Sequence, residues 1–481
     1  MADLADSVYI QAIVGYARLA YLVTARGGEG VGGLDMSSIG KVCWMLLVCV
    51  GMQAHAQAAD RAVLFENVRI FDGRSSSLSE PAHVLVRGNK IDQISSAPIS
   101  AEMIGDGVVI EGAGRTLMPG LIDAHWHAAM AALPLQVLLL SDFGYSQIVA
   151  GQQAQATLMR GFTSVRDLAG PTFGLKQAID HGVIKGPRIW PSGAMISQTG
   201  GHGDFRMPYE VPAACCTTLT RAESLNAGII ADGPDEVRKR VREQLMLGAS
   251  QIKLAAGGGV ASMYDPLDVS QYTVAEFRAA VEAAENWGTY VTVHAYTPRA
   301  IRNAIEGGVR VIEHGQLMDE ESAQLMAEND IWLVIQAFID NEFANPYPEG
   351  SSQRTKQLQM FAGTDNAFEL AKKYDLKVAW GTDILFNREM VSNQGAILTT
   401  MTRWYEPAEV LRMATSTNAE LLQLSGERNP YPGKLGVVEE GALADLLLVD
   451  GDPIADIQLL ANPDQNFLVI MKGGKIYKNS L

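Results

Sequence analysis

An apolar run in this sequence ends in two histidines separated by one residue: Gly120-Leu121-Ile122-Asp123-Ala124-His125-Trp126-His127. Successive side chains of a β-strand point to opposite faces, so His125 and His127 lie on the same face of a strand. Two imidazoles that point toward one place suggest a metal site. Taken alone, the pair is equally consistent with polar residues at the rim of a sheet, and the rest of the chain must distinguish these two interpretations.

The composition restricts the class of protein. A chain of 481 residues allows two or three domains, and a hydrophobic fraction of 47% is ample for a large core. Lys and Arg number 38 against 54 Asp and Glu, which gives a formal net charge of -16. Because this charge has the wrong sign for a nucleic-acid or anionic-membrane partner, we expect a soluble acidic enzyme.

Residues 1–58 predict an upstream extension followed by a signal peptide. Met36 precedes one cation, Lys41, and an apolar run over residues 42–52, and residues 54–58 offer two A-x-A cleavage sites. This run is too short for a permanent membrane helix, so we expect an exported protein, periplasmic or secreted, without a stable membrane anchor after cleavage. Only the adjacent Cys215 and Cys216 then remain, which implies no disulfide framework.

Short strands with glycine turns occupy both ends of the mature chain. They are predicted within residues 59–118 (62–73, 82–91 and 108–112) and within residues 426–481 (436–441, 444–450 and 467–477). Neither half has enough strands to bury a sheet face alone. We therefore expect one small β-sandwich domain formed by both termini.

Residues 119–425 alternate β-rich runs with helical patterns, which indicates an α/β architecture of repeated βα units. The clearest helix is predicted over 234–247, with Pro234 at its first position and acidic residues in its first turn, and another over 275–287. Eight such units predict a (β/α)8 TIM barrel, which carries its chemistry at the carboxyl ends of the strands. The strands are expected at 120–127, 163–167, 188–192, 251–255, 290–294, 309–314, 331–335 and 377–383.

Polar side chains gather at the ends of these strands. They are His125, His127, Lys253, His294, His314 and Asp383. Neutral imidazole suits zinc and related divalent ions, and a carboxylate neutralises their charge. A lysine in a dry barrel interior is costly as an ammonium and shifts its pKa readily, although alone it would be interpreted as an ion-pair partner. Chance would rarely collect this set at one face.

These residues resemble the amidohydrolase superfamily in its binuclear-metal form. Residues 161–167 and 441–446 resemble the same superfamily, and the likeness extends roughly from Ala62 to Tyr477. The resemblance implies two divalent metal ions, with zinc expected, and carboxylation of Lys253 to a carbamate that bridges them. It also implies that His125, His127 and Asp383 hold one ion and that His294 and His314 hold the other.

A metal pair of this kind implies a hydrolytic mechanism. Two cations about 3.5–4 Å apart lower the pKa of a shared water, which gives a bridging hydroxide at neutral pH, and one cation polarises the substrate carbonyl. Asp383 would take the proton of that hydroxide and pass it to the leaving amine. The expected reaction is hydrolysis of an amide bond.

Two loops narrow the expected substrate. Residues 197–204 and 257–266 resemble the Xaa-Pro dipeptidase-like branch of the superfamily, and within it the ochratoxinases, which implies dipeptides or N-acyl amino acids, including ochratoxin A, as substrates. His202 would donate a hydrogen bond to the developing oxyanion, Tyr264 would bind the substrate carboxylate, and Tyr296 is a third substrate-binding candidate. Equally, His202 could only brace its loop and Tyr296 could only pack behind His294.

Other functions are kept open. A lactonase or deaminase of the same superfamily would share most of these ligands and differ in its pocket loops. A non-enzymatic scaffold on the same barrel would lack a ligand, and none is missing from this sequence. Related barrels often form homo-oligomers, which is an analogy only.

Overall fold

A computed structural model describes residues 61–210 and 218–481. The segment from Arg61 to Leu481 is one compact unit. The predicted extension and signal peptide, and also Cys215 and Cys216, lie outside the described residues. Within the described residues, every helix is too short or too polar to cross a membrane.

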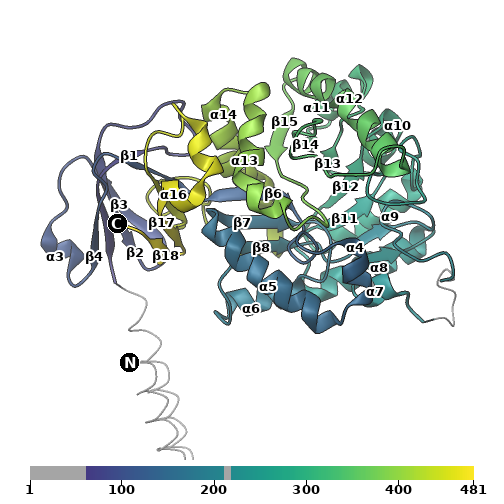
Figure 1. Cartoon of the computed structure of the whole chain (residues 1–481), viewed down its shortest axis with the longest axis horizontal. Helices are drawn as coiled ribbons and strands as arrows, with labels where there is room; N and C mark the ends of the chain where they lie inside the picture. Colours follow the sequence, from purple (N-terminus) through teal and green to yellow (C-terminus); the bar gives the residue numbers. More distant parts are fainter. Residues whose placement is uncertain (1–60, 211–217) are drawn as a thin grey trace, which may run out of the picture. The chain divides into compact units, whose positions relative to one another are not determined.

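Strands from both ends of the chain form one sheet, as Figure 1 shows where the purple and yellow strands lie side by side. The two ends meet where β5 pairs antiparallel with β16. The expected sandwich is one continuous sheet rather than two separate sheets, because β1 pairs with β2 over most of its length and with β5 at Arg69 and Ile70. The strands are β1 (Val63–Ile70), β2 (Ala82–Arg87), β3 (Lys90–Ser95), β4 (Val108–Glu111), β5 (Thr116–Pro119), β16 (Leu446–Val449), β17 (Phe467–Lys472) and β18 (Lys475–Asn479).

The joint domain has one core made by both ends of the chain. Phe65 on β1, Leu117 on β5 and Leu448 on β16 belong to the same buried apolar cluster, together with Val469 on β17. Neither end could cover these side chains alone, which is why the two halves must assemble. Strands from both termini therefore share one sheet and one core.

The middle of the chain contains parallel strands at all eight predicted positions. Their pairing is parallel throughout, in the orders β6-β7-β8 and β10-β9-β11-β12-β13-β14-β15. The strands are β6 (Leu121–Trp126), β7 (Phe162–Asp167), β8 (Arg188–Pro191), β9 (Met195–Ser197), β10 (Gly228–Ile230), β11 (Ile252–Ala255), β12 (Val291–Ala295), β13 (Val311–His314), β14 (Trp332–Ile335) and β15 (Lys377–Trp380).

The third predicted strand is longer than expected and is broken in two. Its first half, β8, pairs with β7, and its second half, β9, pairs with β11. Gly193 lies at the break with a φ of 71°, and a Cβ there would lie 2.1 Å from the Gln244 side chain. Only glycine fits this position, and the change of partner divides the parallel strands into two groups.

Helices follow most of these strands and pack outside them (Figure 1). The predicted helix over 234–247 is confirmed as α8, which has proline at its first position and ends at Gly248 in a left-handed conformation. The longer helices are α5 (Phe143–Met159), α6 (Phe173–Asp180), α8 (Pro234–Leu247), α9 (Val274–Glu285), α10 (Pro298–Glu306), α11 (Glu320–Glu328) and α12 (Ser352–Lys373).

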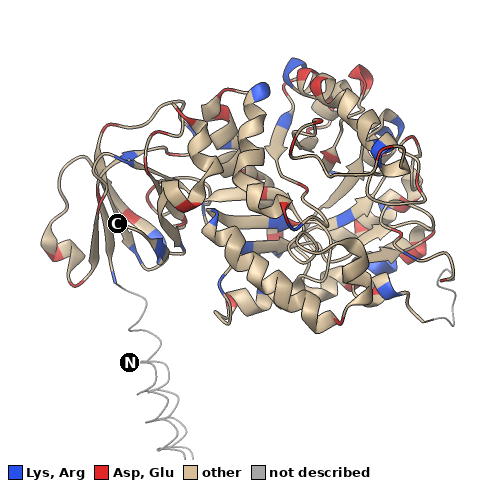
Figure 2. Ribbon diagram, viewed as in Figure 1, with Lys and Arg blue, Asp and Glu red and all other residues tan. Residues whose placement is uncertain are grey.

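Several helices are short. They are α3 (Ala101–Ile104), α4 (Leu135–Leu140), α7 (Arg221–Ser224), α13 (Gln394–Thr399), α14 (Pro407–Arg412), α15 (Asn418–Gln423) and α16 (Pro463–Asn466). Acidic and basic residues are interspersed along the outer helices in Figure 2.

Buried side chains join the last parallel strand to the first. The Asn418 side chain donates to the carbonyl oxygens of Ile122 (2.7 Å) and Trp380 (2.8 Å) and accepts from the N–H of Trp380. Asp123 accepts two hydrogen bonds from Thr382, at 2.7 and 3.1 Å. These contacts join the first half of β6 to the carboxyl end of β15.

Candidate metal centre

Two strand ends place three potential metal ligands around one point. His125 lies on β6, His127 follows it, and Asp383 follows β15. One ligand atom from each of these residues lies within 4.8 Å of those of the other two. Asp383 Oδ1 is 3.2 Å from His125 Nε2 and 3.0 Å from His127 Nε2. This is the predicted convergence of the paired histidines and the carboxylate.

The neighbouring strands add three more predicted residues. His294 on β12 and His314 on β13 have ring centroids 4.5 Å apart, and His314 lies 4.9 Å from the His125 ring. Lys253 on β11 is 2% exposed and lines the same cavity as these histidines. Hence the structure brings all six predicted ligands to the walls of one cavity, as expected for the carboxyl ends of parallel strands.

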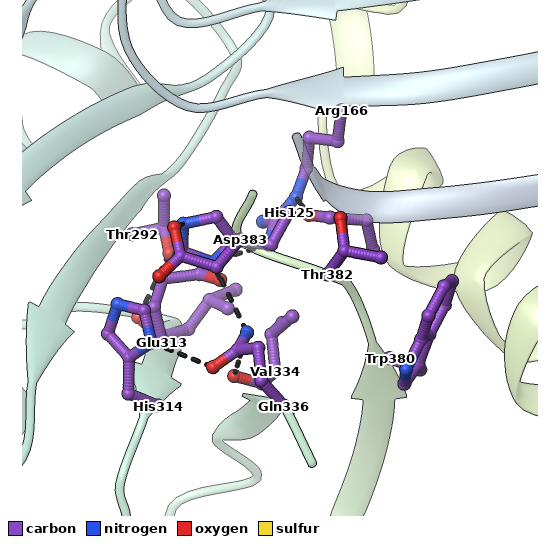
Figure 3. Close-up of polar contacts among 12 residues, drawn as sticks. His125, Arg166, Thr292, Glu313, His314, Val334, Gln336, Trp380, Thr382 and Asp383 are labelled. Atoms are coloured by element: carbon purple, nitrogen blue, oxygen red, sulfur yellow. Dashed lines mark hydrogen bonds and ion pairs between the residues drawn. The ribbon is translucent and has the colours of Figure 1, made fainter. Parts of the chain in front are cut away.

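Three of the predicted histidine ligands have one ring nitrogen in contact with a group outside the predicted ligand set (Figure 3 shows two of them). His125 Nδ1 lies 2.8 Å from Glu313 Oε2, and His314 Nδ1 donates to Gln336 Oε1 at 2.7 Å. His294 Nε2 donates to the carbonyl of Gly258 at 3.0 Å. Metal-binding histidines typically donate their second N–H in this way, which fixes the tautomer and leaves the other nitrogen for an ion.

The amine of Lys253 fits the expected carbamate. Its Nζ is buried and has no hydrogen-bond partner among the described residues. Burial lowers the pKa of Lys253 to about 8, against the opposing effect of Glu313 and Asp383. A neutral buried amine is the form of lysine that reacts with carbon dioxide, and a carbamate would fill the unsatisfied position with oxygen ligands.

Burial and neighbouring charges put the other ligands in metal-binding forms. Burial lowers the pKa of His314 to about 3 and holds the pKa of His294 well below its usual value. Burial opposes ionisation of Asp383, but the His125 ring and hydrogen bonds from His125 and His127 hold the pKa of that carboxyl well below its usual value. At neutral pH His294 and His314 are therefore neutral imidazoles and Asp383 is a carboxylate, which are the protonation states that a divalent ion needs.

A buried ion pair supports the ligands from inside the strands. Arg166 on β7 donates to Glu313 Oε1 at 2.6 Å, to the Ala124 carbonyl at 2.6 Å and to the Tyr290 hydroxyl at 3.0 Å. Both charged groups are fully buried, and Thr292 also donates to Glu313. Burial opposes ionisation of Glu313, but Arg166 and His125 hold its pKa below the usual value.

Apolar side chains form the rest of the cavity. Its volume is about 1160 Å³, part of it open to solvent, which is ample for a dipeptide-sized ligand. Lys253 is the only basic side chain, histidines aside, among the described residues that line it. The apolar wall is formed mainly by Met130, Met195, Phe205, Val260, Phe338, Phe343, Met360, Phe361, Leu385 and Phe386.

The three predicted substrate-binding residues have different positions. His202 lines the cavity, with its ring 4.1 Å from the His294 ring. Tyr296 also lines it and packs 4.7 Å from His294. Tyr264 lies outside the cavity lining, is 41% exposed, and donates its hydroxyl to the carbonyl of Arg206 at 2.7 Å. Carboxylate binding by Tyr264 therefore remains a prediction without a supporting contact.

Sequence reasoning missed several residues of the site. Glu313 directly precedes His314, so a buried acid beside a predicted ligand was a visible signal. Gln336 follows the seventh strand at the predicted active face and carried a weaker signal. The apolar residues of the wall from Phe338 to Phe361 carried no signal in the sequence, because a run without periodicity does not show which cavity its side chains line.

Comparisons with known proteins agree with this geometry. The family model described as "Amidohydrolase family" matches residues 116–477. The ochratoxinase of Aspergillus niger is 32% identical over 387 residues, which cover 75% of each chain. A prolidase solved with N-methylphosphonate-L-proline matches 87% of this chain and 100% of its own (34% identity, TM-score 0.79). A Xaa-Pro dipeptidase solved with bound methionine covers the same shares (30% identity, TM-score 0.75).

The family match, the relatives and the six converging side chains all lead to one assignment. Together they support a hydrolase that acts on C–N bonds in small molecules and uses divalent metal. The chain belongs to the amidohydrolase family, in its ochratoxinase-like and Xaa-Pro dipeptidase-like branch.

Proposed function

We propose that the protein is a metal-dependent amidohydrolase that cleaves dipeptides or N-acyl amino acids. The observation that carries this proposal is the gathering of six potential ligands, including a buried lysine amine without a partner among the described residues, in one cavity. A merely structural cluster would not leave a buried amine unsatisfied on the wall of a cavity.

The six side chains would hold two divalent ions, with zinc the expected metal. His125, His127 and Asp383 would hold one, His294 and His314 the other, and a carboxylated Lys253 would connect them. When bound, such ions supply a hydroxide nucleophile at neutral pH and polarise the substrate carbonyl.

The remaining steps belong to side chains of the chain itself. Asp383, which is ionised at neutral pH, accepts the proton of the attacking water and delivers it to the leaving amine. His202 donates to the carbonyl oxygen as negative charge develops there. Tyr296 is a neutral donor beside the same site, because burial raises the pKa of its phenol well above the usual value.

The apolar wall favours substrates with a bulky uncharged group. Aromatic and methionine side chains would exclude water from one side of the amide and bind that group by burial. The relatives named an ochratoxinase, a prolidase and a Xaa-Pro dipeptidase support amides of amino acids as the substrate class. Ochratoxin A, an N-acyl amino acid with a large aromatic acyl group, is therefore a reasonable first substrate.

The scaffold that we propose is a closed (β/α)8 barrel over residues 119–425, flanked by the domain of residues 59–118 and 426–481. The contacts of Asn418 and Asp123 between β6 and β15 support closure on one side. On the other side, the N–H of Ser250 donates to the Pro191 carbonyl at 2.8 Å, which connects β8 to the start of β11. Export through a leader at residues 36–58 is a separate proposal.

The experiment combines metal analysis with a substrate panel. The purified protein is assayed for metal content and for release of free amino acid from ochratoxin A, Xaa-Pro dipeptides and N-acyl amino acids, with lactones as the comparison. Two divalent ions per chain and release from at least one amide are expected. Hydrolysis of a lactone without release from any amide, with metal bound, would replace this proposal with the lactonase alternative.

A further inference from the structure

A buried ammonium on α12 plays no part in the proposed chemistry. Lys356 is 6% exposed, and its Nζ donates to three backbone carbonyls: Gly259 at 2.7 Å, Ser262 at 2.7 Å and Asp265 at 3.0 Å. An ammonium has three donors, so all of them are used by one loop. Burying the ammonium without hydrogen-bond partners would be costly in free energy. The three carbonyls must therefore stay in contact with it, which fixes the position of the loop.

The same three loop residues hold His202 from their other side. Ser262 Oγ lies 2.5 Å and Asp265 Oδ2 lies 3.4 Å from His202 Nδ1. A Cβ at Gly259 would lie 2.1 Å from the His202 ring, so only glycine fits against this face. Each residue that offers its carbonyl to Lys356 therefore also contacts His202.

The contacts also determine which nitrogen of His202 is available. Because Nδ1 is engaged by Ser262 and Asp265, Nε2 is the nitrogen left for a ligand in the cavity. Asp265 in turn accepts from the N–H of Gly259 at 2.6 Å, which closes the loop on itself. Any shift of the loop moves both groups on Nδ1 and rotates the imidazole.

We propose that Lys356 is a positioning residue for His202: through the carbonyls of residues 259, 262 and 265 it orients the imidazole toward the substrate. This inference rests on the proposed function, because His202 must act on a substrate for its orientation to matter. The alternative is that Lys356 only stabilises the fold. The positioning role and the purely structural role differ in one respect. Only the positioning role predicts that the activity lost on replacing Lys356 depends on the presence of His202.

The test is a double-mutant cycle of Lys356→Met and His202→Asn on an amide that the wild type hydrolyses. Lys356→Met is expected to lower kcat about 10- to 100-fold while KM changes less than about threefold, because misplacing a group needed in the transition state affects kcat first. The double variant should be no slower than His202→Asn alone. If the double variant instead loses kcat by the product of the two single-variant factors, the two residues act independently and the proposal is overturned. Lys372→Met, an exposed change on the same helix, is the matched control.

A second readout needs no activity. Hydrogen exchange over residues 257–266, including the Gly259 amide, should accelerate in Lys356→Met and stay unchanged in Lys372→Met. Unchanged exchange would overturn the proposal. If the wild type cleaves no amide, the proposed function fails while this readout still reports on the loop. If Lys356→Met does not fold, the same cycle is run with Lys356→Arg, which keeps a cation but displaces the carbonyl contacts.

Discussion

Nδ1 of His125 lies 2.8 Å from Oε2 of Glu313, and the other oxygen of that carboxylate accepts from Arg166 at 2.6 Å. The imidazole is thereby held so that Nε2 faces Asp383. All three side chains are buried, so the carboxylate acts at close range in a medium of low polarity. Glu313 therefore links the buried charge of Arg166 to the orientation of His125 in the metal centre (Figure 3).

Replacing Glu313 by glutamine should weaken metal binding. We expect Glu313→Gln to lower the affinity for divalent metal about 10- to 100-fold, the range seen when the partner of a metal-binding histidine is changed. The measurement is competition against a chromophoric chelator. Glu306→Gln, an exposed change, is the control. Equal affinities in the two variants would contradict the role of Glu313.

The same substitution should also destabilise the fold, because it leaves Arg166 as an uncompensated buried charge, at a cost of about 3–5 kcal/mol. Adding Arg166→Met should recover part of this free energy of unfolding but none of the lost metal affinity. Recovery of both would mean that Glu313 affects the metal only through stability.

Loading of the metal centre should depend on carbon dioxide. The pKa of Lys253 is lowered to about 8 by burial, and only its neutral amine can form a carbamate. At constant dissolved carbon dioxide, the rate of reconstitution of metal-free protein should fall roughly tenfold for each pH unit below about 8. Activity recovery after addition of metal with and without bicarbonate measures this dependence. A recovery of activity that is the same with and without bicarbonate would argue against carboxylation of Lys253.

The apolar wall should set substrate preference. Phe343 lies in the segment after β14 and lines the cavity, so Phe343→Ala should lower kcat/KM for substrates with a bulky aromatic acyl group about tenfold or more. Substrates with a small acyl group should change much less. Phe143→Ala, at a residue that is 44% exposed, serves as the control. Equal losses for both substrates would show that Phe343 supports the fold rather than the substrate.

The metal-free protein should be acid-sensitive. Burial lowers the pKa of His314 to about 3 in the folded state, whereas an unfolded histidine titrates near 6.5. Between these values the unfolded chain binds a proton that the folded chain does not, so the free energy of unfolding falls as the pH decreases below about 6.5. Urea unfolding from pH 7.5 to 5 measures the slope. His314→Asn should reduce the slope, and an unchanged slope would contradict this assignment.

The ligand set and the strand pattern could be predicted because both are local. Alternation along a strand places His125 and His127 on one face, and parallel strands bring their carboxyl ends together whatever the loops do. The same reasoning places His294, His314 and Lys253 at that face of the barrel. Strand lengths were less predictable, since the break at Gly193 depends on the Gln244 side chain from α8.

By itself, the sequence determined where the parallel strands lie, that short strands occupy both ends of the mature chain, and which six residues surround one cavity, because short-range patterns encode them. Only the tertiary structure decided how these residues are supported. The contact of Glu313 with Arg166, the hydrogen bonds of Lys356 to the loop beside His202, and the hydrogen bond of Tyr264 to the Arg206 carbonyl all join segments far apart in the chain. Such contacts depend on packing in three dimensions, which no local pattern records.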